Sequence, residues 1–248
     1  MSIDGIVNAY KPSGITSKDF VDIFKKKYNV KKACFCGRLD PLARGKMIIL
    51  CDEKCKLMPQ TNGNNKIYQF EILFGLQTDS DDFMGLLINK NFDNIIFQEK
   101  LYKLKSELER NYINKNVEYY QNFHRYSSIN IKGKPYWMYT KNNEVVEDIP
   151  NHLIKIYDIK IINIFERNLD EVIKINNLYI NQIDKKHDFR QEEIIKQWNE
   201  FRFSNIKLPT FKIEANVSSG FYVRQFVQEL SAKIDFPLLA LDIHRVSI

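Results

Sequence analysis

The sequence predicts a fold of the α+β class, and three observations support this. Short apolar runs rich in β-branched residues, bounded by turn residues, recur along the chain and are typical of strands. Other segments carry apolar residues at the three- and four-residue spacing of an amphipathic helix. The chain has 248 residues, which suits one large domain or two small ones and is enough to bury a core. We find no internal repeat and no low-complexity linker.

The first fifty residues predict a strand, a helix, a loop and a second strand. Residues 5–10, GIVNAY, are apolar and run into the turn sequence KPSG. Thr16 and Asp19 form a helix-start signal of the capping-box type, with Asp in place of the usual Glu. Apolar residues then follow at helical spacing from Phe20 to Tyr28. The run MIILC at 47–51 predicts the second strand.

The remaining elements follow the same two patterns. Residues 66–75 alternate as a half-buried strand does, and the sequence TDSDDFMG after them is an acidic turn. Residues 119–141 are rich in aromatic and basic residues without a clear period. Strand and helix signals alternate again from Phe211 to the end of the chain. The other predicted elements are helices at 96–111 and 190–201 and a strand at 153–165.

Composition sets broad limits on function. The net charge of +6 is compatible with a polyanionic partner but does not require one. We find neither a secretory signal nor an apolar run of the roughly 18 residues that cross a bilayer, so we expect a soluble, cytoplasmic protein. The cysteines at 34, 36, 51 and 55 lack the paired C-x-x-C spacing of zinc sites. We therefore expect reduced structural thiols and no metal site.

The nine residues 37–45, GRLDPLARG, allow two interpretations. Asp-Pro commonly opens a turn and glycines bound loops, so the stretch could be an ordinary turn. Alternatively, the loop presents one carboxylate, that of Asp40, into a pocket. The stretch taken by itself favours the turn, and the choice depends on the rest of the chain.

Five blocks together resemble the TruB family of tRNA pseudouridine synthases, in the order in which that family carries them. The blocks are GIVNAYKPSGITS, GRLDPLARG, KIYQFEILFGLQTDSDDFMG, QNFHRYSS with Gly133, and VSSGFYVRQFVQEL. They resemble, among others, the family's opening K-P-x-G-x-T-S and its G-x-L-D-P-x-A-x-G loop. The resemblance covers residues 5–165 and 211–248.

The resemblance implies a pseudouridine synthase fold, in which helices and loops flank a central, mostly antiparallel mixed sheet with an RNA-binding cleft. It implies a single catalytic domain over 1–248, with a thumb-like RNA-binding loop region at 119–148. The implied activity is isomerisation of uridine to pseudouridine without a cofactor, most commonly at uridine-55 in the TΨC loop of tRNA. The implied partner is RNA, and no membrane partner is expected.

The resemblance also assigns the catalytic residues. Asp40 is implied to act at the sugar, as nucleophile or as base, and Arg224 to keep it charged. Tyr68 is implied to stack on the everted uracil, a contact that typically contributes about 1–3 kcal/mol per base. Tyr222 lies two residues before Arg224, so both side chains face one way if this segment is a strand. Ile243 is implied to line the base pocket. Core packing for Tyr68 and Ile243, and an ordinary edge strand at Tyr222–Arg224, remain the alternatives.

Further residues are expected to bind substrate. These expectations cover Lys11, Phe35, Arg38, Tyr126, Lys132 and Lys134. Phe35 stands where the family has a histidine that helps displace the base, and we hypothesise that Phe35 and Arg38 share this task. Cations interleaved with aromatics in the thumb region suit a loop that contacts RNA; a solvated basic loop is the alternative.

Two departures from the family leave other functions open. Residues 166–210 are an insertion without a counterpart, and the chain ends shortly after Arg245, so the family's RNA-binding PUA domain is expected to be missing. One alternative is a non-catalytic RNA-binding or assembly protein that retains the fold. Another is a synthase that acts on a different RNA, with a protein partner compensating for the missing domain. The insertion could contact RNA or protein, or could be inert.

Overall fold

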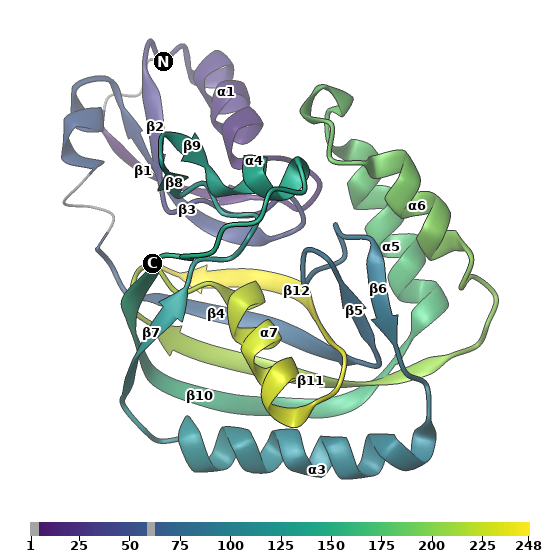
Figure 1. Ribbon diagram of the computed structural model, residues 1–248. Coiled ribbons are helices and arrows are strands. Elements are labelled where there is room, and N and C mark those ends of the chain that lie inside the picture. Colours follow the sequence, from purple (N-terminus) through teal and green to yellow (C-terminus); the bar gives the residue numbers. More distant parts are fainter. Residues whose placement is uncertain (1–4, 59–62) are drawn as a thin grey trace.

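A computed structural model describes residues 5–58 and 63–248 and places eight strands in one sheet (Figure 1). Their order is β1-β3-β12-β4-β11-β10-β7, and β2 pairs with β3 outside this path. The bounds are β1 (Ile6–Lys11), β2 (Ala33–Cys36), β3 (Arg44–Cys51), β4 (Lys66–Phe74), β7 (Val117–Asn122), β10 (Asn151–Asn168), β11 (Lys207–Val217) and β12 (Leu238–Ser247). Neighbours pair antiparallel except β12 and β3, which are parallel. The expected mostly antiparallel mixed sheet is confirmed.

The central strand β4 shows why alternation predicted it only in part. Buried and half-buried residues alternate as far as Phe70, but every residue from Phe70 to Phe74 is buried. Phe70 contacts Phe226 at a ring-centroid distance of 6.4 Å. Glu71, next along the strand, accepts two hydrogen bonds from the Arg167 guanidinium. Because successive side chains face opposite sides of a sheet, both faces are covered here and the polar face of a half-buried strand is lost.

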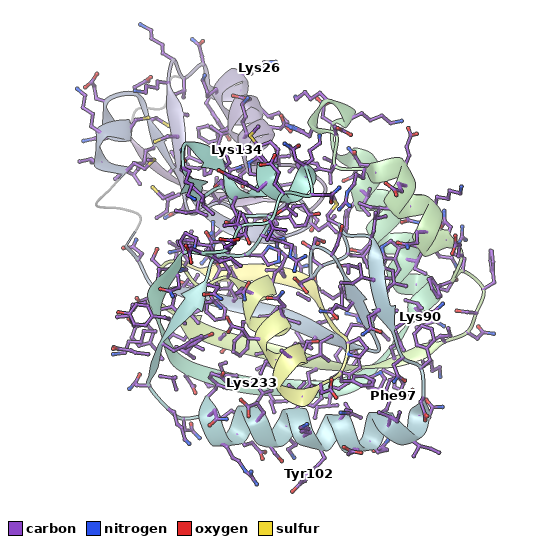
Figure 2. All side chains as sticks on the ribbon, in the orientation of Figure 1. Lys26, Lys90, Phe97, Tyr102, Lys134 and Lys233 are labelled. Atoms are coloured by element: carbon purple, nitrogen blue, oxygen red, sulfur yellow. The ribbon has the colours of Figure 1, made fainter. Side chains whose placement is uncertain are left out.

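Three of the helices, α1 (Ser17–Tyr28), α3 (Asn94–Asn111) and α6 (Gln191–Asn199), confirm the helices predicted from the periodicity of the sequence. The other described helices are α4 (Tyr136–Lys141), α5 (Leu169–Gln182) and α7 (Val223–Ile234), with 3₁₀ turns η1 (Asp52–Leu57) and η2 (Lys185–His187). Helix α1 begins as the cap predicts, because Thr16 Oγ1 accepts a hydrogen bond from the Asp19 amide at 3.0 Å. Figure 2 shows Phe97 and Tyr102 on α3; Phe97 is buried, whereas Tyr102 is exposed.

The expected strand at Tyr222–Arg224 is wrong, because this segment starts helix α7. Tyr222 is the N-cap residue, and its carbonyl accepts the first helical bond from the Phe226 amide at 3.0 Å. The Gln121 side chain accepts from the Tyr222 amide at 2.9 Å and so fixes the entry. The apolar residues that follow are buried at helical spacing, and their packing outweighs the strand preference of Tyr-Val.

Two smaller units flank the sheet. In the thumb region, residues 119–148, β8 (Asn130–Ile131) and β9 (Lys134–Pro135) form a hairpin that leads into α4. Its two loop residues, Lys132 and Gly133, both have positive φ, as a type I′ turn requires. Residues 166–210, which we expected to be an insertion and call the insertion below, contain α5, η2 and α6; α5 and α6 lie beside the hairpin of β5 (Leu76–Thr78) and β6 (Leu87–Lys90) (Figure 1), and η2 contacts α1.

Candidate active site

Asp40 and Arg224 form a bidentate ion pair across 184 residues of sequence. Arg224 donates from Nε to Oδ2 of Asp40 at 2.8 Å and from Nη2 to Oδ1 at 2.9 Å. The guanidinium is 6% exposed, whereas the carboxylate is 32% exposed. Two parallel bonds fix the plane of the carboxylate as well as its charge. The loop therefore presents one oriented, solvent-accessible carboxylate on a buried cation, and the interpretation of GRLDPLARG as an ordinary turn is insufficient.

Lys11 binds the main-chain carbonyls of the Asp40 loop. The ammonium of Lys11 is fully buried, and its Nζ lies within 3.2 Å of four carbonyl oxygens, those of Pro12, Asp40, Pro41 and Ala43, which its three N–H groups share. Burial lowers its pKa to about 7, against the attraction of Asp40. Ser17 adds a bond from its hydroxyl to the Leu39 carbonyl at 2.8 Å. In this structure Lys11 is unavailable to an RNA phosphate, and the expected substrate contact is replaced by loop positioning.

The other side of Arg224 is held by the acidic turn after β5. Its Nη1 donates to the Ser80 carbonyl at 3.2 Å, and its Nε lies 3.6 Å from Oδ2 of Asp82. Asp82 is buried and accepts from the Ser80 hydroxyl and the Met84 amide. Burial raises the pKa of Asp82 to about 6, with Arg224 opposing the rise and Asp40 adding to it. Two carboxylates thus share one guanidinium.

A buried histidine connects the acidic turn to the thumb region. His124 Nε2 lies 3.1 Å from Asp81 Oδ2, and its Nδ1 accepts from the Tyr126 amide at 3.2 Å. A ring nitrogen that accepts carries no proton, so His124 is neutral and donates to Asp81 from Nε2. Burial, followed by the charge of Arg224, lowers the pKa of His124 well below its usual value, in agreement with this tautomer.

Tyr222 lies in the electrostatic field of the Asp40–Arg224 pair. Burial and then the charge of Asp40 raise the pKa of Tyr222, with Tyr68 adding to the rise and Arg224 and Arg38 opposing it. Tyr68 is buried on β4, where it pairs in register with Arg245 of β12. The structure therefore brings Asp40 into contact with Arg224 and places Tyr222 at the start of the helix that carries Arg224, and not on a strand. The place of Tyr68 beside this pair stays a prediction.

Phe35 and Arg38 are neighbours in space as well as in sequence. Arg38 is exposed, and its guanidinium carbon lies 5.6 Å from the centroid of the half-buried Phe35 ring. This is within the range of a cation–π contact. The shared displacement task that we hypothesised from the sequence stays a prediction, to which the contact adds a structural reason.

The thumb lysines differ from each other. Lys132 is exposed at the tip of the β8–β9 hairpin. Lys134, labelled in Figure 2, pairs with Glu144 at 2.6 Å and lies 4.4 Å from the centroid of the Tyr139 ring. Lys132 is therefore the better placed of the two to contact a phosphate, since binding through Lys134 would cost an existing ion pair.

Ile243, which the resemblance implied to line the base pocket, lies on β12 at the edge of a cavity. It lines a cavity of about 220 Å³ with Leu42, Ala43 and Asp82, next to helix α5 of the insertion. Asp40 is not among the lining residues of this cavity. The role of Ile243 in holding the base stays a prediction, and core packing describes its present contacts.

Sequence reasoning missed Asp82 and Arg190. Arg190 of the insertion donates from Nη1 to Asp79 at 2.7 Å and from Nη2 to the Tyr126 hydroxyl at 3.0 Å. The signal for Asp82 was present, because three acidic residues within four positions rarely fold into a buried turn unless cations hold them. Arg190 carried no such signal, since nothing in the sequence of the insertion indicates its partners.

Two further features bear on the chemistry. Cys34, Cys36, Cys51 and Cys55 form no disulfide, and the described residues contain no group of three or more His, Cys, Asp or Glu side chains arranged to hold a metal. Within the described ranges, no helix is both long and apolar enough to span a bilayer.

Comparison with known proteins supports the family resemblance of the sequence. The model of the TruB family pseudouridylate synthase (N terminal domain) matches residues 25–180. The tRNA pseudouridine synthase B of Caldanaerobacter subterraneus subsp. tengcongensis is 33% identical over 162 residues, which cover 65% of this chain and 54% of the relative. The enzyme of the same name from Malacoplasma penetrans is 28% identical over 245 residues, covering 99% of this chain and 85% of the relative.

Solved structures agree on the fold. A Cbf5-Nop10-Gar1 complex matches with a TM-score of 0.53 at 14% identity, over 97% of this chain and 47% of that one. An H/ACA RNP bound to a substrate RNA that contains 2′-deoxyuridine matches with a TM-score of 0.52, also at 14% identity, over 97% of this chain and 46% of that one. These similarities concern the fold alone. Since the family model covers more than half of the sequence, this chain belongs to the TruB family of pseudouridylate synthases.

Proposed function

We propose that this protein isomerises a uridine to pseudouridine in RNA, with uridine-55 of the tRNA TΨC loop as its target. The observation that carries the proposal is the bidentate Asp40–Arg224 pair, which orients an accessible carboxylate. Membership of the TruB family supports the reaction, and relatives named tRNA pseudouridine synthase B support the substrate.

The reaction requires few groups, and the site supplies them. The N1–C1′ bond of uridine breaks, a C5–C1′ bond forms, N1 gains a proton and C5 loses one, so no electrons enter or leave. Asp40 must be ionised whether it attacks the sugar or removes a proton from it. Arg224 stabilises that charge with two hydrogen bonds. Because Arg224 is buried beneath Asp40, water does not screen it fully.

The base must leave the RNA stack before the sugar can reach Asp40. Unstacking costs a few kcal/mol, and stacking on one aromatic ring returns about 1–3 kcal/mol. Tyr222 is half-buried beside Asp40 and Tyr68 lies deeper, so both are candidates for this platform. Phe35 and Arg38 are candidates for filling the space that the base vacates.

Pseudouridine mapping at nucleotide resolution tests the proposal. Unmodified tRNA transcript is incubated with wild type, with Asp40→Asn and with a matched control, Asp22→Asn, in which an exposed carboxylate of α1 is lost. We expect product at the TΨC position with wild type and Asp22→Asn, and none with Asp40→Asn at unchanged RNA affinity. Product at another position indicates a different RNA target. Tight binding without product by wild type, even with cell extract added to supply a partner, contradicts the proposal and leaves an RNA-binding protein.

A further inference from the structure

The insertion has no net formal charge, which argues against a role in binding the RNA backbone. Residues 166–210 contain eight basic and eight acidic side chains. Affinity for a nucleic-acid backbone comes largely from uncompensated Lys and Arg. Several of the cations are also paired within the protein, for example Lys185 with Glu192 and Lys174 with Asp170. The contacts that the insertion makes with the rest of the molecule are therefore a better guide to its role.

Several of the ion pairs that join the insertion to the rest of the molecule lie in one short loop, residues 184–190. Lys186 binds Asp19 at the start of α1 at 3.0 Å, and Asp188 binds Lys141 at the end of α4 at 2.6 Å. These two pairs tie the insertion to α1 and to the thumb region. Arg190, at the end of the loop, points to a third partner, the acidic turn beside the candidate active site.

Arg190 closes a triangle of polar groups. Its Nη1 donates to Asp79 Oδ2 at 2.7 Å, its Nη2 donates to the Tyr126 hydroxyl at 3.0 Å, and that hydroxyl donates to Asp79 at 3.3 Å. The guanidinium also lies 5.9 Å from the Tyr126 ring centroid. Arg190 holds a left-handed backbone, with φ of 61°, which a non-glycine residue adopts at a cost. The fork of two donors is needed here, because a single point charge could not satisfy both partners.

Both partners of Arg190 lead directly to the groups around Arg224. Asp79 opens the acidic turn, and its next neighbour, Ser80, gives its carbonyl to Arg224. Tyr126 donates its amide to His124, whose other nitrogen binds Asp81 in the same turn. The turn thus receives one support from the insertion and one from the thumb region, and Arg190 joins the two.

We infer that Arg190 is a positioning residue for the candidate active site. It fixes the positions of the acidic turn and Tyr126, and the turn in turn holds Arg224 in its hydrogen-bonding position against Asp40. Arg190 touches neither Asp40 nor Arg224 through any of the bonds described above, so it acts through the turn. The inference rests on the proposed function, and it gives the insertion a catalytic purpose that the balanced charge of the segment does not suggest.

Arg190→Ala and a matched control, Lys186→Ala, separate positioning from general bracing. Both variants lose one cation of the same loop, but Lys186 binds Asp19 and Asp184, away from the turn. At saturating RNA we expect Arg190→Ala to slow single-turnover product formation about 10–100-fold, the range that small misplacements cause. RNA affinity should change less than about threefold and Lys186→Ala should keep the wild-type rate. Arg190→Lys should fall between wild type and Arg190→Ala.

Amide hydrogen exchange gives a readout that does not depend on activity. We expect faster exchange in the peptide that spans 78–86 for Arg190→Ala, and unchanged exchange there for Lys186→Ala. If exchange in this peptide is the same in Arg190→Ala and wild type, or if both variants slow the reaction equally, the inference is wrong. A wild type that forms no pseudouridine contradicts the proposed function, whereas the exchange comparison still decides whether Arg190 orders the turn.

Discussion

Replacing Arg224 with methionine tests whether the candidate site is one electrostatic unit. The change keeps an unbranched side chain but removes the cation that Asp40 and the buried Asp82 share. At the 3.6 Å separation from Asp82, a unit charge pair contributes about 4–5 kcal/mol in a medium of effective dielectric constant near 20. Breaking a buried pair typically costs about 3–5 kcal/mol. We expect a loss of about 3 kcal/mol at pH 7.5, since Asp40 is one-third exposed and regains water.

The pH dependence of this loss identifies its cause. Burial already raises the pKa of Asp82 to about 6 with Arg224 present, and removing the cation raises it further. When a carboxyl group has a raised pKa in the folded state, the folded protein loses stability as pH rises. The reason is that this group releases its proton at a lower pH in the unfolded chain than in the folded one. The variant should therefore recover part of its stability at pH 5, where Asp82 is protonated. Adding Asp82→Asn should recover a similar part at pH 7.5.

Urea unfolding followed by tryptophan fluorescence measures these differences. Trp198 is fully buried and stacked on Phe83 at 4.0 Å, so it reports on the surroundings of the neighbouring Asp82. The four proteins to compare are wild type, Arg224→Met, Asp82→Asn and the double variant, each at pH 5 and pH 7.5. An equal loss at both pH values, or a double variant as unstable as Arg224→Met at pH 7.5, would refute the shared-cation account.

Three more predictions follow from the same geometry. Because burial lowers the pKa of Lys11 to about 7, stability should rise with pH between about 7 and 8.5, and urea unfolding of Lys11→Met should show a smaller rise; an identical slope contradicts the assignment. In Lys132→Ala, the slope of log binding constant against log salt concentration should fall by the equivalent of about one phosphate contact. The charge-neutral double variant Lys134→Ala with Glu144→Ala should leave this slope close to wild type. Phe35→Ala should lower the single-turnover rate at a temperature where the variant remains folded, and because the half-buried ring also packs against the core, it should lower the melting temperature as well. Phe35→His should restore part of the rate; full activity of Phe35→Ala would show that the ring takes no part in displacing the base.

The sequence predicted the elements whose signals are local. Helix α3 carries Leu104 and Leu108 on its buried face, and β10 is the β-branched run expected at 153–165. The Asp40–Arg224 pair was also predicted, but through family resemblance, because no local pattern connects residues so far apart. What a side chain does when 184 residues separate it from its partner depends on the sheet topology, which periodicity does not specify.

The misses share a physical cause: tertiary contacts overrode local preference. Tyr222 and Arg224 sit in a β-prone triplet, yet the packing of α7 and the amide of Gln121 start a helix there. A lysine is most often exposed, but the four carbonyls around the Lys11 ammonium offset the cost of removing this charge from water. Arg190 could not be found at all, since an arginine outside the recognised sequence blocks has the same sequence signature whether it faces water or the site.

The last strand, β12, explains why widely separated segments form one site. It lies between β3, which follows the Asp40 loop, and β4, which carries Tyr68, and α7 packs against it. Gly45 has a φ of 126°, and a Cβ atom there would collide with the Arg245 main chain. The parallel contact of β3 and β12 thus needs a glycine at this position. A larger residue would push β3 and the Asp40 loop that precedes it away from β12, so the second glycine of GRLDPLARG sets how closely this loop approaches the strand that pairs with β4.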